Sequence, residues 1–158
     1  MFQADLTLEQ ALQFSRFDSE HPLAPAAACP FQLDEQSWPT AEHYYQANKF
    51  NSSYRHRVAA STTPAEAYHL GNRWFRPKRR DFRRVRLILM TRALYSVATQ
   101  HPEVRDYLLA SGECHIAETS LYDHFWGIGR DQRGHNHLGR IWMDIRARLL
   151  AREKGVHA

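Results

Sequence analysis

The feature that most constrains the fold is the spacing of apolar residues in the second half of the chain. Such residues recur every three or four positions over Phe82–Val97 and again over Leu138–Leu149, which is the period of an amphipathic helix. We expect a long helix that begins near Lys78 and ends before His101, and a final helix that continues to about Lys154. The expected buried faces comprise Phe82, Val85, Leu89, Ala93 and Val97 in the first helix, and Leu138, Ile141, Trp142, Ile145 and Leu149 in the second.

Shorter elements are marked by capping residues and breakers. Thr40 and Thr63 are typical N-capping residues, and Pro102 suits the first position of a helix. The signals predict helices over 40–50, 63–71 and 102–112, strands over 31–33 and 115–119, a turn at 34–35 and a glycine-rich loop over 122–136. The Thr7-x-x-Gln10 capping pattern predicts a short helix over residues 5–14, although residues 2–8 also alternate like a strand. The prediction is an α+β fold, predominantly α-helical, forming a single compact domain over residues 1–158 with a small β component.

The composition narrows the class of protein. The net charge of +4 is mild and only slightly favours an anionic ligand such as a phosphate, a dinucleotide or a nucleic acid. No apolar run is long enough to cross a bilayer, and the first residues lack the basic and apolar regions of a secretory signal. Cys29 and Cys114 are far apart, and we expect two buried, reduced thiols rather than a disulfide. We therefore expect a cytoplasmic protein with no membrane partner.

One predicted helix concentrates groups that can do chemistry. At about 100° per residue, Glu42, Tyr45, Gln46 and Lys49 lie on the same helix face. This face is either a solvated surface with a Glu42–Lys49 ion pair or the wall of a binding pocket. Composition alone favours the solvated surface. Trp38 upstream and the two adjacent tyrosines favour a pocket wall, because so many aromatic rings suit a surface poorly.

The loop 123–129 is a second candidate for a site. Gly127 and Gly129 allow the backbone to approach a ligand closely, and Trp126 offers a stacking face. Asp123 could accept hydrogen bonds from sugar hydroxyls or hold a water molecule. A glycine-rich turn that packs Trp126 into the core is an equally good interpretation. The dinucleotide fingerprint GxGxxG does not fit, because Gln132 stands where the third glycine belongs.

Two other stretches allow weaker interpretations. The basic run 76–86 is either a solvated helix face or a contact for phosphate or nucleic acid, and it lacks the aromatic interleaving of a single-strand platform. His135 and His137 suggest a metal, but no further residues complete a ligand set, and we expect no metal. Asn136 is better explained as the N-cap of the final helix, whose N-terminus could receive a phosphate. Serine-hydrolase, Walker and zinc-protease motifs are absent, which leaves carboxylates with aromatic neighbours, the groups of glycosyl chemistry.

Four blocks of the chain, in the same order, resemble the YbiA-like family, also called the NADAR domain. WPTAEHYYQANKF over Trp38–Phe50 is similar to the family's WPTxEHYYQAxKF, and Phe14–Phe17 resembles its FSNF segment. Glu118–Gly129 resembles its E-x4-D-x-x-WG-x-G segment, and Gly134–Arg146 resembles its G-x-N-x-LG-x-x-LM-x-x-R ending. The resemblance extends over about residues 14–149, and the EHYYQ and WGxG blocks together are specific.

The resemblance implies an enzyme, an N-glycosidase that needs no cofactor. Its expected substrates are phosphorylated ribosylamino-pyrimidine or ribosylamino-uracil intermediates of riboflavin biosynthesis, from which it would release ribose 5-phosphate. Glu42 is the implied acid or base and Asp123 its catalytic partner, which places the active site between the Glu42 helix and the 123–129 loop. The residues implied to bind substrate are Arg16, His43, Tyr45, Gln46, Lys49, Trp126, Gly127 and Asn136. Lys49 or Arg16 is the expected phosphate partner.

The chain departs from the family pattern at several positions. Arg16 replaces the asparagine of FSNF, Phe82 replaces a tryptophan, and Val97 stands where members often carry a lysine. These changes affect the expected substrate more than the reaction. Two alternatives are therefore kept: removal of ADP-ribose from guanine in nucleic acid, the only case with a nucleic-acid partner, and a non-catalytic module that binds ADP-ribose or a nucleotide.

Overall fold

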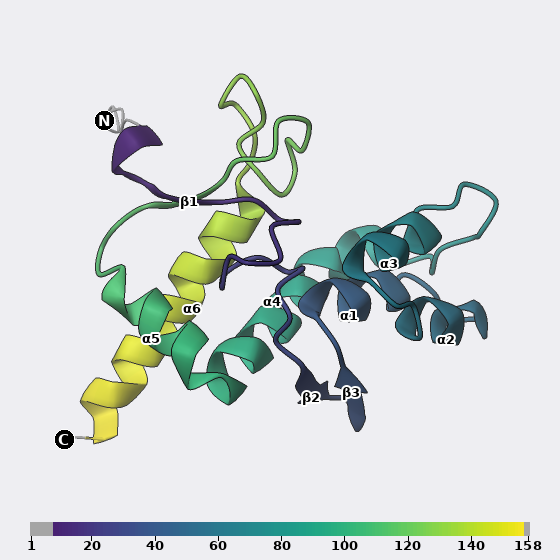
Figure 1. Cartoon of the computed structure of the whole chain (residues 1–158), viewed down its shortest axis with the longest axis horizontal. Coiled ribbons are helices and arrows are strands. Elements are labelled where there is room, and N and C mark those ends of the chain that lie inside the picture. Colours follow the sequence, from purple (N-terminus) through teal and green to yellow (C-terminus); the bar gives the residue numbers. More distant parts are fainter. Residues whose placement is uncertain (1–7, 157–158) are drawn as a thin grey trace. The chain divides into compact units, whose positions relative to one another are not determined.

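The computed structural model describes residues 8–156, and the chain divides into two compact units. One unit is the continuous stretch Phe17–Pro102, and the other combines the two ends of the chain, up to Arg16 and from Glu103 onward. Most of the regular structure is helical, with two small two-stranded sheets (Figure 1). The predicted α+β, predominantly helical fold is confirmed. The expectation of a single domain stays a prediction.

In the unit Phe17–Pro102, a hairpin leads into a cluster of helices. Strands β2 (Phe31–Leu33) and β3 (Gln36–Trp38) pair antiparallel, and Asp34 and Glu35 turn the chain with φ of 54° and 59°. These two left-handed residues have the signs of a type I′ turn, whose twist matches that of the strands. The predicted strand and turn are confirmed, and β3 is an addition to the prediction.

Helix α1 (Ala41–Ala47) lies at the centre of this unit and contacts three other helices. They are α2 (Tyr54–Ala59), α3 (Pro64–Gly71) and α4 (Phe82–Gln100). Thr40 caps α1 as predicted, but the helix ends at Ala47, earlier than expected. Helix α4 begins four residues later than Lys78, because Asp81 occupies its N-cap position. Helix α2 was missed by the sequence patterns.

A polar junction ties the hairpin to two of these helices. The Asp34 carboxylate accepts a hydrogen bond from the Tyr44 hydroxyl on α1 at 3.1 Å and one from Arg92 on α4 at 2.5 Å. Arg92 also donates to the Tyr44 oxygen at 3.1 Å. Burial raises the pKa of Tyr44 to about 12, so its hydroxyl remains protonated and can donate at neutral pH. The hairpin, α1 and α4 are thus held in one arrangement.

The second unit is built from segments far apart in the sequence. After a 3-10 turn at Leu8–Gln10, β1 (Leu12–Phe14) pairs in parallel with β4 (Ile116–Glu118). Helix α5 (Pro102–Ala110) starts at the unit boundary, and α6 (His137–Val156) contacts β4. The helix expected over 5–14 is wrong for its second half, which is a strand, while Thr7 lies outside the described residues. All five residues predicted for the apolar face of α6 are buried.

The cysteines and the surface give two further outcomes. Cys29 and Cys114 are free thiols, as expected, but both are partly exposed rather than buried. Over residues 8–156, no helix has both the length and the apolarity needed to span a membrane.

Removing the N-cap of α3 tests the helix-start signal. Thr63 Oγ1 accepts a hydrogen bond from the Glu66 amide at 3.1 Å, so Thr63→Ala should lower the free energy of unfolding by about 1 kcal/mol in urea denaturation. Thr62→Ala is the matched control, because Thr62 uses only its backbone amide, which donates to the Glu66 carboxylate. An equal loss of stability in both variants would contradict the capping role.

Candidate active site

The predicted polar face of α1 is buried rather than solvated. All seven residues of the helix are buried, and Glu42 and Gln46 have no exposed surface. Helices packed on several sides of α1 account for this burial. The surface interpretation of this face is therefore wrong. Buried acids and amides need hydrogen-bond partners, and Glu42 and Gln46 bond to each other.

Glu42 and Gln46 form the centre of the α1 cluster, the name used here for Glu42, Tyr45, Gln46, Lys49 and Asn72. Gln46 Nε2 donates to Glu42 Oε1 at 2.6 Å, a spacing of one helical turn. The Gln46 Oε1 atom is buried without a hydrogen-bond partner and lies against Gly71, where an added Cβ would stand only 2.1 Å away. Gly71 thus leaves room for the Gln46 amide, which orients the carboxylate.

Lys49 supplies the cation of the α1 cluster. Its Nζ donates to Asn72 Oδ1 at 2.9 Å and lies 5.3 Å from the ring centre of Tyr45 and 5.6 Å from that of Phe82. Asn72 is fixed in turn by its own donation to the Tyr68 carbonyl at 2.8 Å. Aromatic faces attract a cation at such distances, so the lysine is held in a defined place.

His43 uses both ring nitrogens within the protein. Nδ1 lies 2.8 Å from Thr40 Oγ1, and Nε2 lies 3.1 Å from the Ser61 carbonyl oxygen. Burial lowers the pKa of His43 and so favours the neutral imidazole, against the opposing effects of the Ser61 carbonyl and nearby acids. A contact between His43 and substrate would have to break one of these bonds. Its role as a binding residue stays a prediction, and the geometry supports a part in positioning α1.

The second group is the loop cluster, formed by Arg16, Glu118, Ser120, Asp123, Trp126 and Gly127. Asp123 Oδ1 accepts hydrogen bonds from the amides of Phe125 at 3.0 Å and Trp126 at 2.7 Å. Its Oδ2 lies 3.6 Å from Arg16 Nη1, and the Asp123 side chain is 28% exposed. The carboxylate is oriented by the loop yet still reaches the surface.

Trp126 is buried, and the Arg16 guanidinium lies over its indole at 5.5 Å from the ring centre. Gly127 approaches Glu118 so closely that an added Cβ would stand 1.9 Å from Glu118 Oε2. The glycine is therefore required by the carboxyl group beneath it. Direct binding of a ligand by Trp126 and Gly127 stays a prediction.

Glu118 belongs to the loop cluster but was not among the residues predicted from the sequence. It has no exposed surface, and its Oε1 accepts hydrogen bonds from the Arg16 amide at 2.9 Å, the Ser120 amide at 3.1 Å and the Ser120 hydroxyl. Its Oε2 is buried and has no partner. Burial raises the pKa of Glu118, although the hydrogen bonds oppose this. Glu118 is the first letter of the E-x4-D block, which could have marked it.

Asn136 stands at the start of α6, as predicted, but its side chain does different work. Its carbonyl accepts the Arg140 amide at 3.0 Å, while Oδ1 accepts from the Glu118 amide at 3.0 Å and Nδ2 donates to the Ile116 carbonyl at 2.9 Å. The side chain therefore links the helix start to β4. Substrate binding by Asn136 stays a prediction.

The two histidines beside Asn136 stack on each other. The rings of His135 and His137 are 5.4 Å apart and nearly parallel, and His137 also contacts the Phe125 ring. Among residues 8–156, His, Cys, Asp and Glu side chains do not gather in the groups of three that a metal ion needs.

Glu42 and Asp123 belong to different units, one in the α1 cluster and one in the loop cluster. Each carboxylate is oriented by donors of its own unit. Their joint action on one substrate stays a prediction.

Comparison with known proteins defines the class. The N-glycosidase YbiA of Escherichia coli (strain K12) is 34% identical over 137 residues, which cover 86% of each chain. A riboflavin biosynthesis protein of Vibrio vulnificus (strain YJ016) is 33% identical over 144 residues, 90% of this chain and 39% of that protein. The NMR structure of E. coli YbiA matches with a TM-score of 0.81 and 30% identity, over 91% of this chain and 88% of that one.

The protein is an N-glycosidase by class. The sequence model of the NADAR domain matches residues 5–150, and the chain belongs to the NADAR domain family. The family expected from the four sequence blocks is confirmed.

The buried carboxyl group of Glu118 should make the stability of the protein depend on pH. Because burial raises its folded-state pKa above the usual 4.5, the folded chain binds more protons than the unfolded chain just above that pH. This contribution to stability is complete below pH 4.5 and is lost as the pH rises through the folded pKa. The Tm of the wild type minus that of Glu118→Gln should therefore fall as the pH rises from 4.5.

The exposed Glu113 provides the control for this experiment. Glu113→Gln removes a carboxylate from the same unit without touching the loop cluster. Its Tm difference from the wild type should stay nearly constant across the same pH range. A Glu118→Gln difference that is flat or rises with pH would contradict the assignment.

Proposed function

We propose that the protein hydrolyses the N-glycosidic bond of phosphorylated ribosylamino-pyrimidine or ribosylamino-uracil intermediates of riboflavin biosynthesis. In this reaction the bond between the anomeric carbon and nitrogen breaks, nitrogen takes a proton, and a water oxygen bonds to the anomeric carbon. The products are the free amine and ribose 5-phosphate. No cofactor is needed for this chemistry.

The single observation that best supports the proposal is the buried Glu42 carboxylate, held at 2.6 Å by Gln46 within the block that resembles the family's WPTxEHYYQAxKF. A carboxyl group removed from water and oriented by an amide is suited to proton transfer. The substrate class is supported by the names of two relatives, the N-glycosidase YbiA and a riboflavin biosynthesis protein.

The two carboxylates take different roles in this proposal. Glu42 transfers the proton, either to the leaving nitrogen or from the attacking water. Asp123 orients the ribose or stabilises the positive charge that develops at the anomeric carbon. Its two backbone donors orient the carboxylate, and its partial exposure lets it face a sugar.

The remaining residues bind the substrate. Trp126 stacks on the base or the sugar, and Gln46 and Asn136 bind its polar groups. Lys49 or Arg16 binds the phosphate. Tyr45, one of the rings beside the Lys49 ammonium, keeps that cation in place.

Replacing Glu42 by Gln keeps the shape of the side chain and removes the carboxyl group that is proposed to transfer the proton. We expect Glu42→Gln to lower kcat for ribose 5-phosphate release by about 100- to 10,000-fold, the usual contribution of a positioned acid or base. Product is quantified after incubation with the ribosylamino-pyrimidine phosphate, and Tm and circular dichroism confirm that the variant folds. Glu113→Gln, at an exposed position, should retain the wild-type rate.

A double variant tests whether Glu42 and Asp123 serve the same reaction step. Groups that act as a unit are strongly non-additive, so Glu42→Gln with Asp123→Asn should be little slower than the slower single variant. Wild-type turnover by a folded Glu42→Gln protein would overturn its catalytic role. Release of ADP-ribose from ADP-ribosylated guanine, or tight binding without turnover, would instead favour one of the two alternatives.

Phosphate recognition is tested by comparing substrates with and without the 5′-phosphate. The wild type should prefer the phosphorylated substrate through a lower KM, and Lys49→Met or Arg16→Met should remove most of that preference. Arg148→Met, which removes an exposed cation from α6, is the control. If both Lys49→Met and Arg16→Met keep the wild-type preference, neither residue binds the phosphate.

A further inference from the structure

The positive charge of the protein is concentrated in one short segment. Residues 73–86, called the basic loop below, contain eight of the 21 Lys and Arg residues but one of the 17 Asp and Glu residues. The rest of the chain contains 13 basic and 16 acidic residues. The net positive charge of the whole chain therefore comes from the basic loop, and such a local concentration of positive charge attracts a polyanion.

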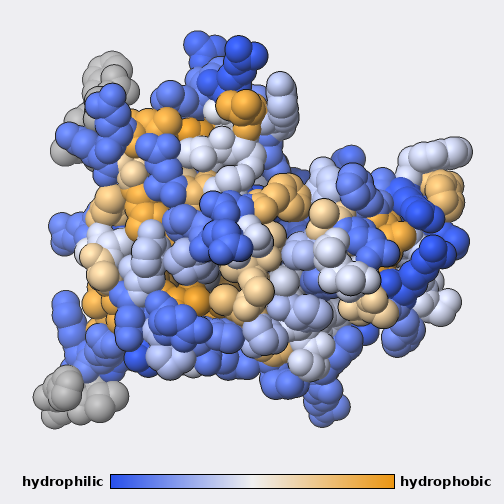
Figure 2. Space-filling model, in the orientation of Figure 1, coloured by the Kyte–Doolittle hydropathy of each residue, from blue (hydrophilic) through white to orange (hydrophobic). Residues whose placement is uncertain are grey.

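Most of these cations point to solvent. Arg76, Lys78, Arg80, Arg83 and Arg84 are exposed, in the connection between α3 and α4 and the first turn of α4. Figure 2 shows strongly hydrophilic side chains, with apolar ones among them, at the end of the view where Figure 1 draws the connection between α3 and α4. Asp81, the one acidic residue of the segment, is paired with Arg79. Arg79 Nε donates to Asp81 Oδ1 at 2.5 Å, and Arg79 Nη2 donates to Asp81 Oδ2 at 2.8 Å.

Two aromatic rings lie exposed at the start of the basic loop. Trp74 is 93% exposed and Phe75 is 52% exposed, with ring centres 5.8 Å apart. The basic run 76–86 lacks the aromatic interleaving of a single-strand platform, but these two rings directly precede that run. The guanidinium groups of Arg73 and Arg76 lie 5.9 Å and 5.5 Å from the Phe75 ring. An indole left almost wholly in water is costly unless it has a partner.

The basic loop is anchored at several points. The Arg79 amide donates to the Lys49 carbonyl at 2.8 Å, and the Arg76 guanidinium lies 4.5 Å from the Tyr54 ring centre. Such anchors lower the entropy that binding would otherwise cost. The cations and rings are therefore presented on a partly preorganised surface.

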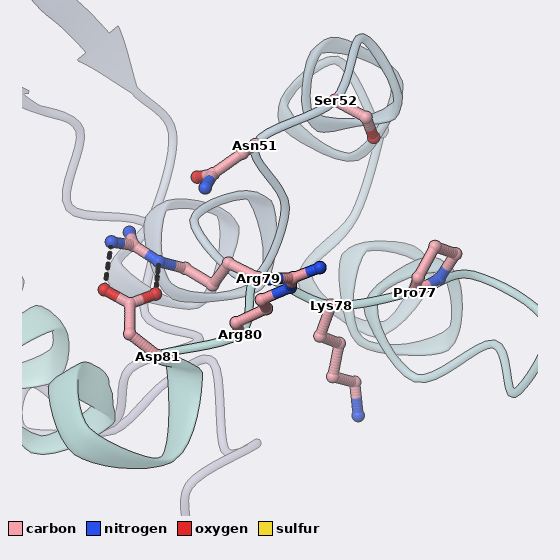
Figure 3. A pocket seen from close by; sticks show the side chains of 7 residues that line it. All are labelled: Asn51, Ser52, Pro77, Lys78, Arg79, Arg80 and Asp81. Atoms are coloured by element: carbon pink, nitrogen blue, oxygen red, sulfur yellow. Dashed lines mark hydrogen bonds and ion pairs between the residues drawn. The ribbon is translucent and has the colours of Figure 1, made fainter.

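A cavity of about 500 Å³ opens beside these residues. It is lined by Asn51, Ser52, Pro77, Lys78, Arg79, Arg80 and Asp81 (Figure 3). In Figure 3 the Arg79 side chain runs to Asp81, while Lys78 points away from that pair. Its lining offers an amide and a hydroxyl next to cations, which suits phosphate oxygens and the polar edge of a base.

We propose that the basic loop binds single-stranded nucleic acid. Bases stack on Trp74 and Phe75, and the phosphates of neighbouring nucleotides contact Arg80, Arg83 and Arg84. Stacking rings beside a cationic track are the combination by which proteins hold single strands without sequence preference. A double helix would hide its bases from these rings, so the surface favours single strands over duplex.

The test is fluorescence anisotropy with a labelled, unmodified dT20 oligonucleotide across a range of salt concentrations. Arg80→Gln/Arg83→Gln/Arg84→Gln should weaken binding and reduce the slope of log affinity against log salt by about 2, since each single-strand phosphate contact contributes about 0.7. Arg140→Gln/Arg148→Gln/Lys154→Gln makes the same charge change at exposed positions of α6 and should bind like the wild type.

A second variant tests the stacking. Trp74→Ala should weaken dT20 binding about 5- to 100-fold, while Trp74→Phe should retain most of the affinity. Equal binding by the loop and α6 triple variants would overturn the proposal. Trp74→Ala binding as tightly as the wild type, or a stronger preference for duplex DNA or for phosphatidylserine vesicles than for dT20, would do the same. None of these outcomes depends on the riboflavin-intermediate reaction, which is measured separately.

Discussion

The burial of a carboxylate and an amide on α1 is the physical constraint on which the unit Phe17–Pro102 depends. Burying the Glu42 carboxyl group costs free energy unless hydrogen-bond donors replace the lost solvent. Gln46, one turn further on, donates at 2.6 Å, and Gly71 leaves the space that the Gln46 amide occupies. Thr40 and His43 fix the helix start from the other side. Each neighbour of α1 thus serves either to cover the acid or to orient it.

A comparable constraint organises the second unit. Strands β1 and β4 are about a hundred residues apart in the chain, and Glu118 at the end of β4 lies beneath Gly127. The Glu118 side chain then collects three donors on one oxygen, from Arg16 and Ser120, while Asn136 binds the Glu118 backbone. The loop that carries Asp123 is therefore built on a buried carboxyl group. A substitution at Glu118 is therefore expected to disturb the position of Asp123 indirectly, through the loop.

Local signals in the sequence were sufficient for most helices but not for the contacts between them. The capping pattern at Thr63 and the apolar period of α6 predicted these elements correctly, because both depend on residues within a few positions of each other. The solvated interpretation of the Glu42 face failed because helical period shows which residues share a face, not what covers it. Glu118 was missed for the same reason: its burial follows from strand pairing across about a hundred residues. Trp74 was missed because exposure cannot be read from composition.

Two of the three departures from the family pattern involve the cations of the candidate site rather than its proposed acid. Arg16, in place of asparagine, forms an ion pair with Asp123 and covers Trp126. Phe82, in place of tryptophan, contacts Lys49 with a ring that has no N–H to donate. Val97 is simply buried among core residues. Since phosphate and base are the groups that cations and rings recognise, we expect these changes to affect what is bound, while the residues proposed to break the bond keep the family's identities.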